Sequence, residues 1–550
     1  MRVCARVFHR VASESRKQKA AAKHENETGV MMTTTTTTMT TRGVGEKSCF
    51  LRASRTTTTR WKTERVGRKA KRRIPTSITC FEGGGGGEEE EEEDGTRTMK
   101  KKKKKNVKNV AVIGAGFAGL SCAYNLIKSG GNNDGVRVTL FASEQAGSGG
   151  ASSVAAGLLH QRTPKGFKMP FGSSGYEKTL ELLQKCQKIE EMMVDPDLRL
   201  DMNGIDFRFS GELRDVKREK MYRKIGCLKP ARTEKDEIGM RKNVFNNEGE
   251  DIRFVEREEI EVDLLRLRNK GEEYKEKDAN NSCGFYVENG IVVNAQRYLE
   301  ALKVLIEFEA AKNADADVSF AFRKHHVESL EEIMKRPNEF DCVVLCCGGE
   351  ILRDGFLDES TKQELLEKAG GTLELQAGRA LVLEREKCFV QEKWEMPGIL
   401  GSHYLSPFQT TKAMFGPTKE RGDKVKPEDA AKAGYYSTET AKSTLPDTQE
   451  TIDFLMRELN EKVYPTKNGS PHFFSAKDIE TIAYGVRVNG PRTHVGRFPK
   501  IVRFDNNRVF AVTAVGARGL LYHALLGEWV ARTVLSSSTS FETIVPAEFR

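Results

Sequence analysis

The 550-residue chain lacks several features that would assign it to a common class of protein. No run of 18 apolar residues occurs in it, so we expect no membrane span. No apolar stretch of about 7–15 residues follows the N-terminus, so we expect no secretory signal. The 11 cysteines form no C-x-x-C pair and the histidines form no H-E-x-x-H array, so we predict no metal site.

Positive charge is abundant, but it is confined to one part of the chain. Residues 1–110 contain 27 Lys and Arg against 13 Asp and Glu, whereas the other 440 residues contain 62 against 66. The formal charge of +10 therefore belongs to the N-terminal part. Overall charge gives no support to polyanion binding by the rest of the chain, where only a local basic patch could provide it.

The first 106 residues have the composition of a targeting segment rather than of a folded domain. Residues 1–80 contain 19 Lys and Arg, five Glu and no Asp, and low-complexity runs occur at Thr33–Thr38, Gly83–Gly87 and Glu88–Glu93. Such segments bury too little apolar surface to offset the entropy that is lost on ordering. We predict a disordered transit peptide and low-complexity linker over 1–106, with the chloroplast as destination and the mitochondrion as the alternative.

The most informative motif is a glycine-rich turn between an apolar run and a helical pattern. The run Val110–Ile113 leads into the G-x-G-x-x-G sequence of Gly114–Gly119, and residues 120–127 then show a helical pattern. This order binds a dinucleotide pyrophosphate, because the glycines let backbone approach the phosphates and the positive end of the helix faces them. The sequence therefore predicts a dinucleotide-binding fold. A glycine turn in another kind of α/β domain is the alternative.

An acidic residue follows at the place where such folds bind a ribose. The next predicted strand is Val136–Phe141, and Glu144 comes shortly after it. Glu144 lies slightly further from the glycines than the usual spacing of about 20 residues. The loop at 130–135 accounts for the excess, so we predict that Glu144 binds a ribose hydroxyl.

Further strands and glycine-rich turns are predicted along the chain. Residues 149–159 are a run of small residues that lets backbone lie against a flat cofactor. Strands at 341–347 and 508–514 each end in glycines, and a helix over 521–535 follows the second. Residues 284–294 predict a β-hairpin.

These blocks, in this order, resemble the flavoproteins of the D-amino-acid-oxidase (DAO) superfamily over about residues 107–535. The matching blocks are Gly114–Gly119, Gly149–Leu159, Val343–Gly349, Gly485–Arg487 and Gly516–Leu520. With the last two segments counted as one paired C-terminal block, four ordered blocks over about 400 residues are far more specific than the glycine turn alone.

One branch of the superfamily is the most similar. Val138–Glu144 and Gly516–Leu520 resemble segments of the oxidoreductase half of MnmC, an enzyme that makes methylaminomethyl groups on tRNA wobble uridine. Val488 interrupts the superfamily's usual G-x-R-P, as it does in that branch. We expect no counterpart of the methyltransferase half of MnmC, because the additional length of the chain is the low-complexity N-terminal segment.

The resemblance implies that FAD is bound by several separate parts of the chain. The glycine turn and Glu144 would bind the ADP half, the backbone of Val327 would meet the adenine, and the last block would face the flavin pyrimidine. The implied cofactor-binding residues are Gly114, Ala115, Gly116, Phe117, Ala118, Gly119, Glu144, Ala151, Ser152, Ala156, Gly157, Leu158, Val327, Gly348, Gly516, Ala517, Arg518, Gly519 and Leu520. The helix that starts at the last block would stabilise negative charge on the flavin.

Three side chains are implied on the substrate side. Arg487 matches the family's substrate-carboxylate arginine, and its planar fork of donors suits a bidentate carboxylate contact. Tyr404 would line the active site, with His403 as a candidate proton carrier. Arg518 would act near the flavin. The alternatives are a surface ion pair for Arg487, a core position for Tyr404, and packing or a phosphate contact for Arg518.

The predicted fold class is α/β (α+β overall), with a Rossmann-like FAD-binding domain and a second, mainly antiparallel β-sheet substrate domain. The discontinuous FAD-binding domain is assigned to 107–165, 285–360 and 481–540. The substrate domain is assigned to 166–284 and 361–480.

The function implied by the resemblance is FAD-dependent oxidation of a C–N bond in an amine that carries a carboxylate, with O2 as electron acceptor. The first choice of substrate is the carboxymethylaminomethyl group of tRNA wobble uridine. Basic stretches at 214–232 and 240–242 could hold tRNA phosphates, although such runs are usually solvated. The alternative substrate is free glycine, sarcosine or a D-amino acid. A non-catalytic binding protein with the FAD fold is the alternative from another class.

Overall fold

The computed structural model describes residues 107–131, 135–194, 219–247, 250–260, 283–336, 339–384, 396–463, 474–494, 496–536 and 539–550. They belong to one unit, Met99–Arg550. The predicted transit peptide and linker at 1–106 lie outside the described residues, and so do residues 214–218 of the first basic stretch.

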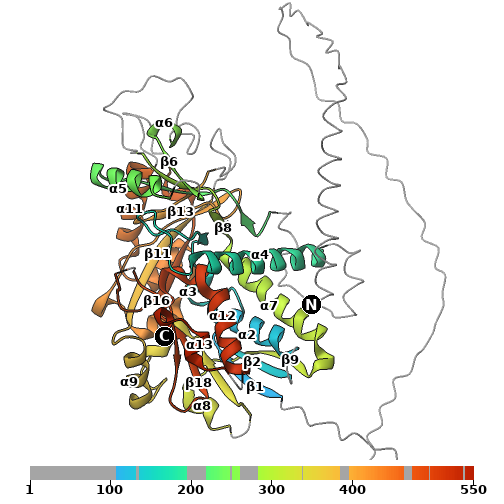
Figure 1. Ribbon diagram of the computed structural model, residues 1–550. Helices are drawn as coiled ribbons and strands as arrows, with labels where there is room; N and C mark the ends of the chain where they lie inside the picture. Colours follow the sequence, from blue (N-terminus) through green and yellow to red (C-terminus); the bar gives the residue numbers. More distant parts are fainter. Residues whose placement is uncertain are drawn as a thin grey trace, which may run out of the picture. The chain divides into compact units, whose positions relative to one another are not determined.

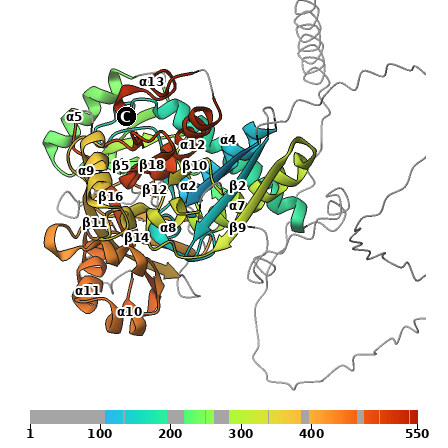
Figure 2. The same ribbon diagram turned by 90° about the horizontal axis from the view of Figure 1, so that it is seen from below.

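The described residues contain a six-stranded sheet in the order β17-β18-β10-β1-β2-β9 (Figures 1 and 2). Its strands are β1 (Lys108–Ile113), β2 (Val136–Ala142), β9 (Val318–Lys324), β10 (Cys342–Leu345), β17 (Lys500–Arg503) and β18 (Val509–Thr513). Neighbouring strands are parallel, except for the antiparallel pair β17 and β18. The apolar run of β1 is buried on both sides, as is usual in a parallel sheet.

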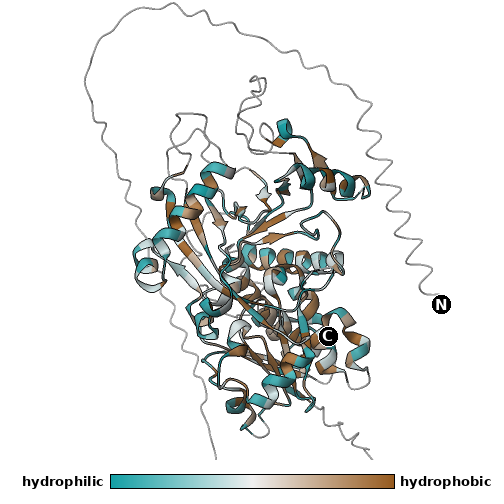
Figure 3. Ribbon diagram, turned by 90° about the vertical axis from the view of Figure 1, so that its left-hand side faces the viewer, coloured by the Kyte–Doolittle hydropathy of each residue, from teal (hydrophilic) through white to brown (hydrophobic). Residues whose placement is uncertain are grey.

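Helices cover both faces of this sheet. One face packs against α2 (Phe117–Gly130), α7 (Ala295–Lys312) and α12 (Gly519–Leu535), with α4 (Gly172–Val194) in the same apolar core. The other face packs against α8 (Leu330–Met334) and α9 (Glu359–Lys368). Figure 3 shows the apolar strands enclosed by helices whose outward sides are hydrophilic. Among the described helices, none has the combination of length and hydrophobicity that crossing a bilayer requires.

A nine-stranded sheet, again counting only described residues, forms the second part, in the order β15-β16-β11-β14-β13-β12-β5-β7-β6. Its strands are β5 (Cys227–Pro230), β6 (Ile252–Val255), β7 (Gly284–Val287), β11 (Glu374–Glu384), β12 (Gly398–Ile399), β13 (Tyr404–Ser406), β14 (Lys412–Gly416), β15 (Gly434–Tyr436) and β16 (Ile479–Asn489). All neighbours are antiparallel except β5 and β12. The predicted fold class, an α/β part with a second mainly antiparallel sheet, is confirmed.

The two faces of the nine-stranded sheet have different neighbours. Side chains alternate between faces along each strand. The outer face, which carries Ala377, Leu381 and Val486, packs in one core with α10 (Thr438–Thr444) and α11 (Thr448–Glu458). The inner face carries the residues that alternate with these, and it packs against α3 (Gly150–Ser153) and the chain just after it.

The hairpin predicted at 284–294 is wrong. β7 pairs with β5 and β6 in the nine-stranded sheet, whereas β8 (Ile291–Val293) pairs with β3 (Leu158–Leu159) and β4 (Tyr222–Arg223) in a small separate sheet. Gly290 lies so close to Cys227 that a Cβ atom there would be 2.5 Å from its backbone nitrogen. The two strands therefore diverge at this crossing instead of pairing.

The remaining helical elements lie in the connections between the strands and at the C-terminus. They are α5 (Glu234–Phe245), α6 (Arg257–Glu259), α13 (Phe541–Ile544), η5 (Ala314–Ala316), η6 (Gly348–Leu352), η7 (Gly422–Lys424), η8 (Pro427–Lys432), η9 (Leu459–Val463), η10 (Ala476–Asp478), η11 (Gly516–Arg518) and η12 (Ala547–Phe549). The domain limits stay a prediction. β16 begins at Ile479 and belongs entirely to the nine-stranded sheet, although residues from 481 onward were assigned to the FAD-binding domain.

Candidate functional site

The glycine turn joins β1 to α2 through contacts that exclude side chains. Gly114 has a φ of +106°, and a Cβ atom there would lie 2.4 Å from the carbonyl oxygen of Cys346. A Cβ atom at Gly119 would lie 1.8 Å from the carbonyl oxygen of Gly114. Glycine is therefore required at both positions, and α2 starts directly against the turn.

The N-terminus of α2 is contacted by α3. Gly116, which precedes the helix, offers no side-chain cap, and the N–H of Phe117 donates to Ser152 Oγ at 3.1 Å. The Phe117 ring points inward, with its centroid 5.2 Å from the ring of His523, and Ala118 is buried. The backbone of this turn, the positive helix end and the Ser152 hydroxyl suit a pyrophosphate.

Glu144 lies just beyond the carboxyl end of β2, beside the turn. Its Oε2 is 2.9 Å from Nζ of Lys324, and both side chains are about half exposed. Lys324 ends β9 and pairs in register with Ala142. Because the parallel strands β1, β2 and β9 end at the same edge, the predicted ribose-binding carboxylate and the glycine turn share that edge.

Two further predicted residues follow β9 and β10. Val327 is buried, and its carbonyl oxygen accepts a hydrogen bond from Arg353 at 3.4 Å. Gly348 has a φ of +60°, and no atom lies within 4 Å of a Cβ placed there. Gly348 follows the Cys346 that contacts Gly114, so open space adjoins the turn on this side.

The run of small residues after Glu144 lies between the two sheets. A Cβ atom at Gly485 of β16 would lie 3.3 Å from Cα of Ala151. A Cβ atom at Gly157 would lie 1.8 Å from the carbonyl oxygen of Val293, and the Ala156 carbonyl accepts a hydrogen bond from Ser406. These contacts bring the predicted flavin-bordering segment against the inner face.

The C-terminal block returns to the same place. Val515 forms a bridge with Asn489 at the end of β16, and a Cβ atom at Gly516 would lie 2.7 Å from Asn489 Oδ1. A Cβ atom at Gly519 would lie 3.6 Å from Cδ2 of Phe117, so α12 begins beside the start of α2. Two helix N-termini therefore converge where the prediction expected them to meet. Elsewhere in this block, Ala517 is exposed and Leu520 is buried in the core.

Arg518 is a cation without a carboxylate partner among the described residues. Its guanidinium lies 5.2 Å from the ring centroid of Phe498 and contacts Tyr522, while Nη1 is buried without a hydrogen bond. Burial lowers its pKa. Burial, and then the charge of Arg518, lower the pKa of His160 to about 4. A neutral imidazole and an unpaired guanidinium therefore lie near the start of α12.

The substrate-side arginine is held by an amide. Arg487 on β16 lies opposite Gln376 on β11, and Nε and Nη2 donate to Gln376 Oε1 at 3.3 and 3.1 Å. Asn489 Nδ2 donates to the same oxygen at 3.1 Å, while Gln376 Nε2 is buried without a partner. Burial lowers the pKa of Arg487, and no described carboxylate lies within 4 Å of it. An unpaired cation beside an unsatisfied amide donor suits a ligand carboxylate.

Tyr404 and His403 lie on opposite sides of the sheet. Tyr404 pairs with Gly416 on the inner face, and its charge interaction with Arg487 indicates that the two side chains are close. Burial raises the pKa of Tyr404 to about 12. His403 packs against Phe415 and Phe454 in the direction of α11, and Nδ1 lies 3.1 Å from the Pro417 carbonyl. Tyr404, and not His403, therefore lies with Arg487.

Sequence reasoning missed Gln376 and His523. Gln376 has no motif around it and lies 111 positions from Arg487, so only the β11–β16 register brings them together. His523 is buried between Tyr298 and Phe117, with Nε2 2.8 Å from the Tyr298 hydroxyl. Tyr298 and His523 lie on two helices that are far apart in the sequence, so no local motif predicts that they meet.

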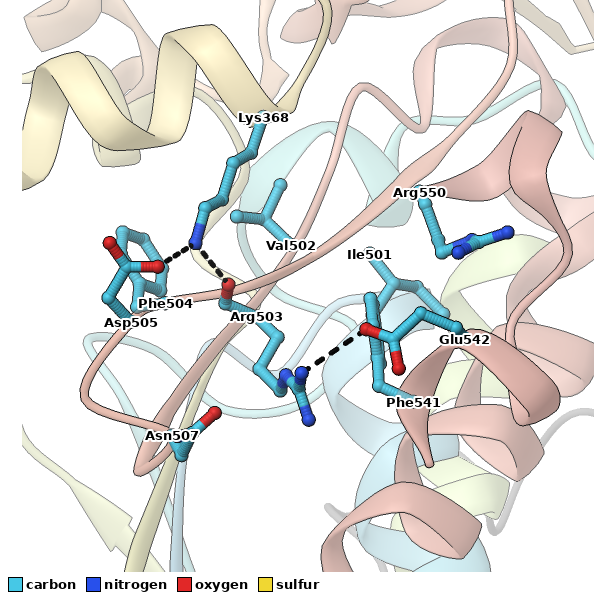
Figure 4. A pocket seen from close by; sticks show the side chains of 10 residues that line it. All are labelled: Lys368, Ile501, Val502, Arg503, Phe504, Asp505, Asn507, Phe541, Glu542 and Arg550. Carbon is cyan, nitrogen blue, oxygen red and sulfur yellow. Dashed lines mark hydrogen bonds and ion pairs between the residues drawn. The ribbon is translucent and has the colours of Figure 1, made fainter. Parts of the chain in front are cut away.

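A cavity of about 430 Å³ lies elsewhere, beside β17 (Figure 4). It is lined by Lys368, Ile501, Val502, Arg503, Phe504, Asp505, Asn507, Phe541, Glu542 and Arg550. Its charges are largely paired, with Lys368 2.6 Å from Asp505 and Arg503 3.2 Å from Glu542. None of the predicted site residues lines it.

Comparisons with known proteins give the family of the chain. A family model described as "FAD dependent oxidoreductase" (DAO) matches residues 109–533. The search of curated proteins found no match. Among solved structures, glycine oxidase from Geobacillus kaustophilus matches at 16% identity with a TM-score of 0.46, covering 80% of this chain and 98% of that chain. Iminodiacetate oxidase from Chelativorans sp. BNC1 matches at 14% identity and 0.47, covering 80% and 98%. L-proline dehydrogenase from P. horikoshii matches at 13% identity and 0.48, covering 79% and 95%.

The family match spans both sheets and every part of the site described above. The glycine contacts, the two converging helix N-termini and the open space at Gly348 fit the cofactor that the family uses. The chain therefore belongs to the DAO family of FAD-dependent oxidoreductases.

Proposed function

We propose that the enzyme oxidises the C–N bond of an amine that carries a carboxylate. The observation that carries this proposal is Arg487, a half-buried cation with no carboxylate partner among the described residues, held by Gln376 on the inner face. That face packs on α3, whose Ser152 contacts the glycine turn. A carboxylate at Arg487 would place the neighbouring carbon and nitrogen towards the cofactor site.

FAD, when bound, supplies the chemistry, because it accepts a hydride from the carbon next to the nitrogen. Arg487 binds the carboxylate, and Gln376 fixes the plane of the guanidinium and offers its free amide donor. Tyr404 stays protonated over the ordinary pH range, so its hydroxyl can donate a hydrogen bond to the substrate. The start of α12 favours negative charge beside it. Water then hydrolyses the imine product, and O2 takes the two electrons as hydrogen peroxide.

Two versions of the substrate follow. The resemblance to the oxidoreductase half of MnmC motivates the first, the carboxymethylaminomethyl group of tRNA wobble uridine. The second is a free small amino acid such as glycine, sarcosine or a D-amino acid. Arg241 in the second basic stretch is paired with Glu237 and Glu256, so it is not a free phosphate contact.

Flavin reduction under anaerobic conditions tests the proposal. Purified holoenzyme is mixed with glycine, sarcosine, D-alanine and methylamine, and bleaching of the flavin absorbance is followed. Carboxylate-bearing amines should bleach the flavin and methylamine should not. Nucleoside analysis of tRNA from a deletion strain separates the two versions, because accumulation of the carboxymethylaminomethyl form supports the first. A purified protein without flavin absorbance would instead support the non-catalytic alternative.

We also propose that the enzyme acts in the chloroplast, on the basis of the composition of residues 1–80. A fluorescent fusion of residues 1–106 should accumulate in chloroplasts. Accumulation in mitochondria would support the alternative destination.

A further inference from the structure

The chain between β14 and η7 runs beside β11 and places two cations on the inner face. Ala377 and Glu420 form an antiparallel bridge, with backbone hydrogen bonds of 3.2 and 3.0 Å in the two directions. In that register Arg421 lies opposite Gln376, and Lys419 lies opposite Gly378. Because alternate residues share a face, Lys419 and Arg421 point to the side that carries Gln376.

The acidic residue between them is turned away. Glu420 lies on the outer side with Arg379, whose Nε is 3.3 Å from Glu420 Oε1. Arg379 is buried there and also bonds the Pro446 carbonyl. Glu420 therefore balances a charge on the other face and does not neutralise its two neighbours in the chain.

A third cation reaches the same face from β5. Leu228 belongs to the core of the outer face, so Lys229, the next residue, points to the inner face. Lys229 is half-buried, and burial followed by the charge of Arg232 lowers its pKa to about 8. Lys419 also acts on Lys229, although the two residues lie far apart in the sequence.

The positive charges of these side chains lower the pKa of Arg487 and of one another. Burial lowers the pKa of Lys419, and the charges of Arg487, Arg232 and Arg421 lower it further. Arg421 likewise lowers the pKa of Arg487. The charges are therefore close enough to repel, which is a cost in the free enzyme.

Compensating carboxylates are few among the described residues. Glu374 lies 3.6 Å from Arg421, but it is shared with Arg497 at 2.7 Å. No described carboxylate lies within 4 Å of Lys229 or Lys419. An uncompensated group of cations next to a substrate-binding arginine is typical of an anion site.

We propose that the substrate carries a second anionic group, a carboxylate or a phosphate, which is bound by Lys419, Arg421 and Lys229 on the inner face while Arg487 binds the first carboxylate. This inference rests on the proposed function. The segment that carries Lys419 and Arg421 runs beside β11 on the side away from β16, so it lies two strand spacings from β16, or about 10 Å. The second group is therefore expected several bonds beyond the amine nitrogen, and N-substituted glycines with an anionic tail fit this arrangement.

Binding of matched thioethers tests the inference without turnover. (Butylthio)acetate carries one carboxylate, and 4-(carboxymethylthio)butanoate carries a second at the end of a chain of similar length. Dissociation constants are measured on the holoenzyme from the change in flavin absorbance and by calorimetry. The dianion should bind about tenfold more tightly than the monoanion.

Variants at an exposed position locate the effect. Lys419→Ala should remove most of the tenfold preference, and Lys419→Arg should retain it. Lys424→Ala, which removes an exposed charge from η7 nearby, is the matched control and should keep the preference. Equal binding of the two thioethers, or a preference that survives in Lys419→Ala, would overturn the inference.

Oxidation assays separate this inference from the proposed function. N-butylglycine and N-(3-carboxypropyl)glycine are compared by anaerobic flavin reduction. Equal rates and affinities with both would remove the second subsite and leave carboxylate-amine oxidation intact. If neither reduces the flavin while the thioether preference remains, the proposed function fails and the subsite stands.

A competition experiment, in which other anions displace the dianionic thioether, identifies the source of the second anionic group. An RNA stem-loop that displaces the dianionic thioether from the wild type, but not from Lys419→Ala, would assign the group to a nucleic-acid phosphate. Displacement by small dianions alone would assign it to a free amino acid.

Discussion

The two sheets build their halves of the site by different means. Around the six-stranded sheet, backbone makes the site, because Gly114 and Gly119 allow contacts that any Cβ atom would prevent. On the nine-stranded sheet, side chains make it, because Gln376 on β11, Arg487 on β16 and Lys419 in the segment after β14 share one face. The first half depends on a local sequence, and the second depends on strand register.

The largest effect is expected in the backbone-built half. Gly114→Val adds a side chain at a φ of +106° and 2.4 Å from a carbonyl oxygen, so the turn must move. We expect the purified variant to contain essentially no FAD, as measured by its flavin absorbance. Gly239→Ala in α5 is the control, since nothing lies within 4 Å of its Cβ and it should stabilise by about 0.5–1 kcal/mol. A Gly114→Val protein that binds a full complement of FAD would show that the site around the six-stranded sheet does not depend on the backbone contact at Gly114.

Arg487 should give the largest effect in the side-chain-built half. Arg487→Ala removes the carboxylate contact but leaves the glycine turn untouched, so FAD content should remain normal. We expect kcat/KM for a carboxylate-bearing amine to fall about a hundredfold or more. Arg487→Lys should recover only part of the loss, because the planar fork is absent. A similar loss with an amine that lacks a carboxylate would contradict this role.

The pH dependence of binding sharpens the role of the cations. Lys229 has a pKa of about 8, with Arg232, Asp236 and Lys419 as its charged neighbours. It is charged below that pH and neutral above it, so affinity for the dianionic thioether should fall by up to about tenfold between pH 7 and 9. Affinity for the monoanion should change much less. Calorimetry in two buffers should detect proton uptake on binding near pH 8.

Lys229→Met is the control for the predicted fall in affinity between pH 7 and 9. The variant should bind the dianionic thioether weakly at every pH, and its affinity should not change near pH 8. If the fall in affinity persists in Lys229→Met, another group is responsible for it.

The smallest effect is expected where the two sheets meet. Ser152→Ala removes the hydroxyl that accepts from the N–H of Phe117, and loss of such a cap costs about 1 kcal/mol. We expect a melting temperature lower by a few degrees and modestly weaker FAD binding. Ser148→Ala, at an exposed position close by, should change neither quantity. Equal destabilisation by both substitutions would show that the contact with α2 is unimportant.

Sequence reasoning reached local features and failed on pairing between segments. The strand, glycine turn and helix at Val110–Ile127 are found as predicted, because adjacent residues decide that pattern. The hairpin at 284–294 was wrong, since its two strands find partners in different sheets. Gln376 could not be predicted, because its importance comes from its register with Arg487.

The sequence by itself determined the family, the cofactor and the glycine turn that joins β1 to α2 in the six-stranded sheet, because glycines and apolar periodicity act over a few residues. Tertiary structure decided which side chains surround Arg487 and which carboxylates are kept away from it. Glu420 shows the reason: alternation along one strand turns it to the outer face, and its neighbours Lys419 and Arg421 to the inner. Local sequence specifies backbone conformation, whereas only strand pairing specifies which charges share a surface.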